Sequence, residues 1–124
     1  MANSQVVHVI DDDADVRQSL AFLLSTAGLA VRVHESAAAF LKILANAQDG
    51  CIVTDVRMPG MNGYQVTDAA LRLKPELKVL LVTGYSQEPL PKHIADAGIK
   101  LLHKPLDMDQ LSALAHKMLA HSRN

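Results

Sequence analysis

The sequence predicts an α/β fold in which five strand–helix units, (βα)5, form a doubly wound parallel five-stranded sheet. Short apolar runs rich in β-branched residues alternate with segments whose apolar residues recur at helical spacing. No linker, internal repeat or low-complexity stretch interrupts this alternation. The chain has 124 residues, of which 49% are hydrophobic, and this is the size of one domain with a substantial core. We therefore expect a single domain over residues 1–124.

The first strand–helix unit shows both patterns clearly. Val6–Ile10 is a continuous, mostly β-branched run, typical of a strand buried on both faces of a parallel sheet. The apolar residues of Ala14–Ala27 then fall on one helical face, and Gly28 follows as a C-terminal cap. The later strands are expected at residues 30–34, 51–54, 78–82 and 99–102, and the later helices at about 37–46, 64–73, 90–97 and 108–120. Asp107 can cap the last helix, with Gln110 at the capping-box position.

The composition argues against several classes of partner. Twelve Lys and Arg residues stand against thirteen Asp and Glu, so the net charge is −1 and no bulk basic field attracts nucleic acid or a membrane. Residues 1–5 lack the features of a secretory signal, and no apolar run approaches the ~18 residues of a membrane span. We expect a cytoplasmic protein. Cys51 is the single cysteine, and we interpret it as a small core residue that opens a strand.

Polar residues follow four of the expected strands, at the edge where parallel sheets bind their ligands. They are Asp11-Asp12-Asp13 after the first strand, Asp55 after the third, Thr83-Gly84 after the fourth and His103-Lys104-Pro105 after the fifth. If the first strand lies beside the third, the acidic group and Asp55 become neighbours. Carboxylates so close together repel one another unless a cation neutralises their charge, and such hard oxygen ligands suit Mg²⁺. The electrostatics thus indicate a divalent metal site.

The same edge carries groups that suit phosphoryl chemistry. Lys104 adds a mobile positive charge and Thr83 adds a hydroxyl. A metal, an ammonium, a hydroxyl and backbone N–H groups are the parts that stabilise a phosphoryl group next to a carboxylate. Asp55 is the carboxylate that ends the third expected strand, beside a loop shaped by proline and glycine. Asp11–Asp13 also has a simpler interpretation as a helix N-cap cluster, because Asp favours the first turn.

These motifs, in this order, resemble the receiver domain of two-component response regulators. The resemblance runs from about Val6 to about Leu119 and is carried by "VIDDD", "TDVRMPGMNG", "LLVTGY" and "LLHKPL". The N-terminal half, "VHVIDDDADVRQSLAFLLSTAGL", is most similar to receivers of the nitrogen-fixation, FixJ/LuxR type, which usually precede a LuxR-like DNA-binding domain. The resemblance implies the flavodoxin-like strand order 2-1-3-4-5.

The resemblance also implies a role for each matching residue around the metal. Asp55 matches the phosphoacceptor, and Asp11 with Asp12 matches the acidic pair that binds Mg²⁺ or Mn²⁺ together with Asp55. Arg57 matches the position that gives its backbone carbonyl to the metal.

On the phosphate side, Thr83 matches the switch hydroxyl and Lys104 the lysine that contacts the phosphoryl group, with a cis bond expected before Pro105. The sequence departs from the family where an aromatic switch residue is usual, because Leu101 stands there. Tyr85, two residues after Thr83, is a candidate to supply an aromatic group instead.

As a receiver, the chain would accept a phosphoryl group from a sensor histidine kinase or a phosphotransfer protein in a two-component phosphorelay and would switch its interaction surface. It would be a self-phosphorylating and self-dephosphorylating signal-transduction phosphoprotein rather than a turnover enzyme, with a homodimer as one candidate assembly. A pseudo-receiver that acts only as an interaction scaffold is the main alternative. An aspartate-nucleophile phosphatase would need an acid where Arg57 stands, and a flavin or dinucleotide binder would need glycines where Asp11–Asp13 stands.

Overall fold

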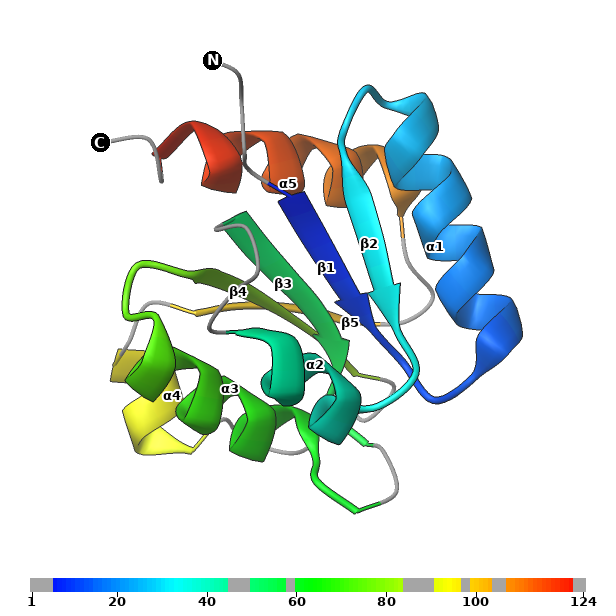
Figure 1. Cartoon of the computed structure of the whole chain (residues 1–124). Helices are drawn as coiled ribbons and strands as arrows, with labels where there is room; N and C mark the ends of the chain where they lie inside the picture. The colour runs from blue at the N-terminus through cyan, green and yellow to red at the C-terminus, as the bar shows by residue number, and fades with distance from the viewer. Residues whose placement is uncertain are drawn as a thin grey trace.

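Strands and helices alternate in the computed structural model as the sequence predicts (Figure 1). The structure describes residues 6–44, 50–57, 60–83, 91–96, 99–103 and 107–121. In chain order the elements are β1 (Val6–Ile10), α1 (Ala14–Thr26), β2 (Val31–His34), α2 (Ala37–Ile43), β3 (Gly50–Asp55), α3 (Gly63–Leu73), β4 (Lys78–Thr83), α4 (Lys92–Asp96), β5 (Lys100–His103) and α5 (Met108–His121).

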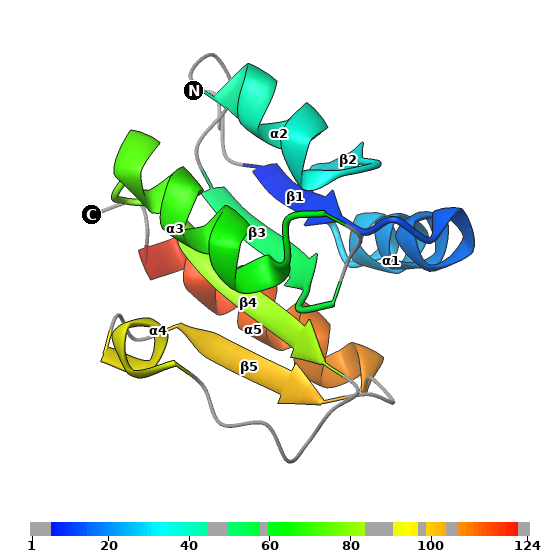
Figure 2. The same cartoon turned by 90° about the horizontal axis from the view of Figure 1, so that it is seen from below.

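The five strands form one parallel sheet in the order β2-β1-β3-β4-β5. This confirms the doubly wound architecture and its flavodoxin-like order. Helices α1 and α5 pack on one face of the sheet, and α2, α3 and α4 pack on the other (Figures 1 and 2). The β1–β3 pair brings together two segments that are more than forty residues apart, from Val6 opposite Gly50 to Ile10 opposite Thr54.

Three strands extend one residue further than the apolar pattern predicts. β3, β4 and β5 end at Asp55, Thr83 and His103, whereas their expected ends were residues 54, 82 and 102. Ladder pairing continues past the last apolar residue, because backbone hydrogen bonding does not depend on side-chain polarity. Two helices are shorter than expected: α2 ends at Ile43, and α4 spans Lys92–Asp96, while residues 45–46, 90 and 97 lie outside the described ranges.

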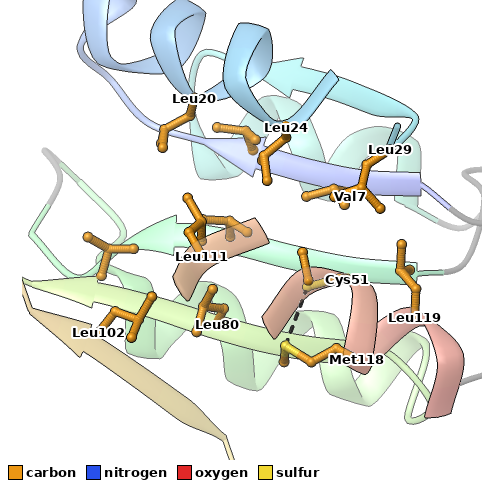
Figure 3. Packing of buried hydrophobic residues seen from close by; sticks show 14 residues of the cluster. Val7, Leu20, Leu24, Leu29, Cys51, Leu80, Leu102, Leu111, Met118 and Leu119 are labelled. Carbon is orange, nitrogen blue, oxygen red and sulfur yellow. Dashed lines mark hydrogen bonds between the residues drawn. The ribbon is translucent and has the colours of Figure 1, made fainter. Parts of the chain in front are cut away.

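Residues of each strand alternate between two hydrophobic clusters, one on each face of the sheet. The cluster under α1 and α5 contains Val7, Val9, Leu20, Leu24, Leu29, Cys51, Val53, Leu80, Val82, Leu102, Leu111, Ala115, Met118 and Leu119 (Figure 3). Cys51 is a free thiol in this cluster, with its Sγ 3.8 Å from the Sδ of Met118, and burial raises its pKa to about 12. This agrees with the predicted core role of Cys51.

The ends of α1 are fixed by local hydrogen bonds. Asp13 is the N-cap, and its Oδ1 accepts the N–H groups of Asp15 and Val16 at 2.9 and 3.3 Å. At the other end Gly28 takes a positive φ of 90°, and its N–H bonds the carbonyl of Ser25 while Leu29 bonds back to Leu24, which is a Schellman motif. The predicted cap at Gly28 is therefore confirmed.

The last helix, α5, is tied both to its own start and to α1. Asp107 accepts the N–H of Gln110 at 3.1 Å, as the sequence predicts for its cap. Further along, His116 places its Nε2 2.9 Å from the carbonyl oxygen of Ala27, the C-cap residue of α1. Since the last carbonyls of a helix lack partners within the helix, this contact satisfies one of them from a neighbouring helix.

Two buried histidines contact each other on the other face of the sheet. Nδ1 of His8 in β1 lies 3.0 Å from Nε2 of His34 in β2, and both side chains are buried. The ring of Phe40 in α2 packs edge-on against His34, with 5.0 Å between ring centroids. Burial, together with the nearby His8 and Arg32, lowers the pKa of His34 from 6.5 to about 4.

We predict that His34 makes stability fall with acidification over a defined range. The unfolded chain protonates His34 below pH 6.5, whereas the folded chain resists protonation down to about pH 4. The free energy of unfolding is therefore unaffected by His34 above about pH 6.5 and falls progressively as the pH is lowered from there toward 4.

Urea unfolding from pH 7.5 to 4 measures this dependence. His34→Gln keeps a polar side chain but does not titrate, so its free energy of unfolding should fall less than that of the wild type over the same range. Parallel pH profiles for the two proteins would contradict the assignment.

Candidate functional site

The parallel register gathers the predicted site residues at the carboxyl edge of the sheet, where the arrowheads point in Figure 2. Asp55 ends β3 and lies opposite Val82 of β4, so it is one position from the strand end Thr83. Asp11 directly follows Ile10, which lies opposite Thr54. Since β3 has β1 on one side and β4 on the other, Asp55 is flanked by the acidic segment and by Thr83.

The acidic segment between β1 and α1 contains three aspartates in different environments. Asp11 is only 4% exposed, and its Oδ1 accepts the N–H of Asp13 at 2.9 Å. Asp13 is exposed and caps α1, whereas Asp12 is exposed on the connecting turn. The N-cap interpretation therefore accounts for Asp13, whereas the carboxylate of Asp11 bonds within the turn and Asp12 is exposed beside it.

Asp55 is half-buried at the end of the central strand. Its Oδ1 accepts the N–H of Arg57 at 3.2 Å, so the turn after β3 orients the carboxylate from the backbone. The chain then returns closely: Gly63 donates its N–H to the carbonyl of Val56 at 2.8 Å, and a Cβ at Gly63 would stand 2.5 Å from the carbonyl oxygen of Asp55. Because real Cβ atoms do not approach oxygen so closely, glycine is required where α3 begins.

On the side of Asp55 away from the acidic segment, the structure describes Thr83 and Leu101 among the predicted site residues. Thr83 is buried as the last residue of β4, and it lies opposite His103 of β5. Leu101 is half-buried on β5 and packs against the cluster under α2, α3 and α4. Tyr85, Lys104 and Pro105 lie outside the described residues, so their predicted roles and the cis bond stay predictions.

The chemistry of the donor set fits a hard divalent ion. Asp11, Asp12 and Asp55 offer carboxylate oxygens and Arg57 offers a backbone carbonyl, which are the ligand types of Mg²⁺ and Mn²⁺. Within the described ranges, however, no three Asp, Glu, His or Cys side chains group closely enough to hold an ion as they stand. The strands thus place the predicted donors along one edge, while their side chains are not arranged around a common point.

Comparison with known proteins identifies the class. Residues 7–116 match the family model described as the response regulator receiver domain, and the chain belongs to this family. The resemblance inferred from the sequence motifs is confirmed.

The relatives include several FixJ proteins. The transcriptional regulatory protein FixJ of Azorhizobium caulinodans is 43% identical over 123 residues, covering 98% of this chain and 58% of the relative. The crystal structure of FixJ-N superposes with a TM-score of 0.83 at 33% identity, covering 97% of this chain and 96% of that one. Full-length FixJ from B. japonicum superposes with a TM-score of 0.86 at 34% identity, covering 98% of this chain and 60% of that one. The chain thus spans little more than half the length of these full-length relatives.

Across the described residues, we find no helix whose length and apolarity would suffice to cross a membrane.

We predict that Gly63→Ala disturbs the end of β3. The added Cβ must displace the backbone of Asp55 and Val56, which should lower the free energy of unfolding by roughly 1–3 kcal/mol and move the amide signals of both residues. Gly28→Ala is a matched control, because it strains a positive φ with nothing within 4 Å and lies at the far end of α1. It should lower stability without moving those signals; unmoved Asp55 and Val56 amides in Gly63→Ala would contradict the prediction.

Proposed function

We propose that this chain is a receiver that accepts a phosphoryl group on Asp55 from a sensor histidine kinase or a phosphotransfer protein. The observation that carries the proposal is the position of Asp55: a half-buried carboxylate at the end of the central strand, flanked by the acidic segment on one side and Thr83 on the other. Membership of the response regulator receiver family supports this function.

In the proposed reaction a carboxylate oxygen of Asp55 attacks the phosphorus of the donor in line with the leaving group. A P–O bond to Asp55 forms as the bond between phosphorus and the donor nitrogen or oxygen breaks, and the donor leaves with that electron pair. The Arg57 N–H already bonds Oδ1 of Asp55, so the carboxylate is oriented before the donor arrives. One chain takes one phosphoryl group, which is stoichiometric acceptance rather than turnover.

The residues around Asp55 would manage the added charge. A divalent ion held by Asp11, Asp12, Asp55 and the carbonyl of Arg57 would supply charge neutralisation at the transferring group. On the opposite side, the hydroxyl of Thr83 and the ammonium of Lys104 would bond the phosphoryl oxygens.

The proposed output is a change in the surface that meets a partner, either a second copy of the chain or another part of a longer regulator. Phosphorylation would draw Thr83 and Lys104 inward and pull on the segments that lead into α4 and β5. Leu101 has no ring or hydroxyl to follow this movement, and it packs against buried neighbours. We therefore propose that Tyr85 and the segment before α4 carry more of the response than β5 does.

We predict that acetyl phosphate with Mg²⁺ adds one phosphoryl group to the wild type and none to Asp55→Asn, as measured by intact mass. Asp13→Asn is a suitable control, because it changes an exposed acid that caps α1 and should still be labelled. Equal labelling of the wild type and Asp55→Asn would refute the phosphoacceptor assignment, and an unlabelled wild type would favour the pseudo-receiver scaffold.

We also predict that Mg²⁺ binding depends on Asp12 more than on Asp13. Asp12→Ala should lose most of the Mg²⁺-induced amide shifts in an NMR titration, because it removes a proposed ligand. Asp13→Ala should keep these shifts and instead lose about 1 kcal/mol of stability, because it removes the N-cap of α1. A normal titration of Asp12→Ala would rule out its role as a ligand.

A further inference from the structure

Arg17 connects the body of α1 to the acidic segment that precedes the helix. Its half-buried side chain turns back along the helix, and Nη1 donates a hydrogen bond of 2.7 Å to the backbone carbonyl of Asp11. Its own backbone N–H bonds the carbonyl of Asp13 at 2.9 Å, in the first turn of α1. The arginine side chain therefore adds a hold on the carbonyl of Asp11 to the backbone bond that any residue at this position would make to Asp13.

The contact completes a set of hydrogen bonds around Asp11. The backbone N–H of Asp11 reaches the carbonyl of His34 at 3.4 Å, and its side chain accepts the N–H of Asp13 at 2.9 Å. With the carbonyl held by Arg17, the N–H, the side chain and the C=O of Asp11 each have a partner. The arginine contact differs from the others because it fixes the peptide group that leads out of Asp11.

Fixing that peptide fixes the direction in which Asp12 starts. The peptide bond between Asp11 and Asp12 is planar, so a held carbonyl oxygen also sets the N–H of Asp12 and the line toward its Cα. Asp12 is exposed and gains little orientation from packing. The bond from Arg17 acts directly on the peptide entering Asp12, in addition to the turn that the Asp11 side chain closes with the N–H of Asp13.

The charge of Arg17 makes its placement informative. A guanidinium among Asp11, Asp12 and Asp13 could pair with a carboxylate, yet the described contact goes to a neutral carbonyl. Because arginine stays protonated at all physiological pH values, the contact does not depend on pH.

We propose that Arg17 is a positioning residue, which holds the Asp11–Asp12 peptide so that both carboxylates can receive a divalent ion. The inference rests on the proposed function, since it gives Arg17 a role toward the proposed metal ligands. A different role, in which Arg17 only braces the fold, predicts a loss of stability without a loss of Mg²⁺ affinity.

The test is Mg²⁺ affinity by amide NMR titration, with urea unfolding measured in parallel. Arg17→Met removes the donor and the charge, and we expect at least a tenfold loss of affinity, within the range found when a residue that orients metal ligands is removed. Arg17→Lys keeps a charged donor on a long stem and should recover much of the affinity. Should Arg17→Met not fold, Arg17→Gln serves instead, because its amide is too short to reach the Asp11 carbonyl.

The sign of the effect separates positioning from simple electrostatics. Removing a positive charge near acidic ligands would by itself tighten the binding of a cation. Unchanged or tighter Mg²⁺ binding in Arg17→Met or Arg17→Gln would overturn the inference, as would equal weakening in Arg17→Lys. Asp13→Ala is the control for stability, because it weakens the same end of α1 through its cap and should retain wild-type affinity.

The same series distinguishes this inference from the proposed function. A wild type that takes up neither Mg²⁺ nor a phosphoryl group would overturn both. A wild type that does both, beside an Arg17→Met protein with the same Mg²⁺ affinity, would overturn the role of Arg17 alone.

Discussion

The pairing of β1 with β3 is the constraint on which the rest of the structure depends. Five register pairs, from Val6 with Gly50 to Ile10 with Thr54, join segments that are distant in the sequence. Both strands lie inside the sheet and contribute to both hydrophobic clusters, so they cannot slide without exposing apolar side chains. The acidic segment and Asp55 are held at one edge by this pairing, despite the repulsion between their charges. The core thus supplies the energy that keeps like charges together.

Residues of the candidate site lie on two kinds of backbone, the ends of strands and the turns that follow them. Asp55 and Thr83 are the last residues of strands, so the ladder fixes their positions. Asp12 and Arg57 lie on turns, where hydrogen bonds from neighbouring residues must do the same work. A site built in this way can keep its nucleophile fixed while the surrounding segments respond to a ligand or a new charge.

Much of this architecture is predictable from the sequence, because apolar periodicity reports burial directly. It predicted every strand and helix described here, the single core cysteine and the edge at which the site residues meet. The strand ends were placed one residue early, because polarity at Asp55, Thr83 and His103 hides pairing that depends only on the backbone.

Two contacts could not have been found in this way. His8 and His34 are 26 positions apart, and only the β1–β2 register makes them neighbours. The bond from Arg17 goes to a backbone carbonyl, and such a bond has no signature in the sequence of residue types. The sequence shows only that Arg17 stands six residues after Asp11, near the start of α1. Roles assigned to Lys104, Pro105 and Tyr85 depend on the family resemblance and lie outside the described residues.

The position of α5 has a consequence for the order in which the chain is synthesised. This helix is the last described element to leave the ribosome, yet it supplies Leu111, Ala115, Met118 and Leu119 to the cluster that covers β1 and β3 (Figure 3). Its His116 also caps the end of α1, 89 residues earlier. A nascent chain that stops short of α5 therefore exposes an apolar sheet face and an uncapped helix end, which are features that chaperones bind and that promote aggregation. The hydrophobic cluster on this face of the sheet is complete only after this helix has been synthesised.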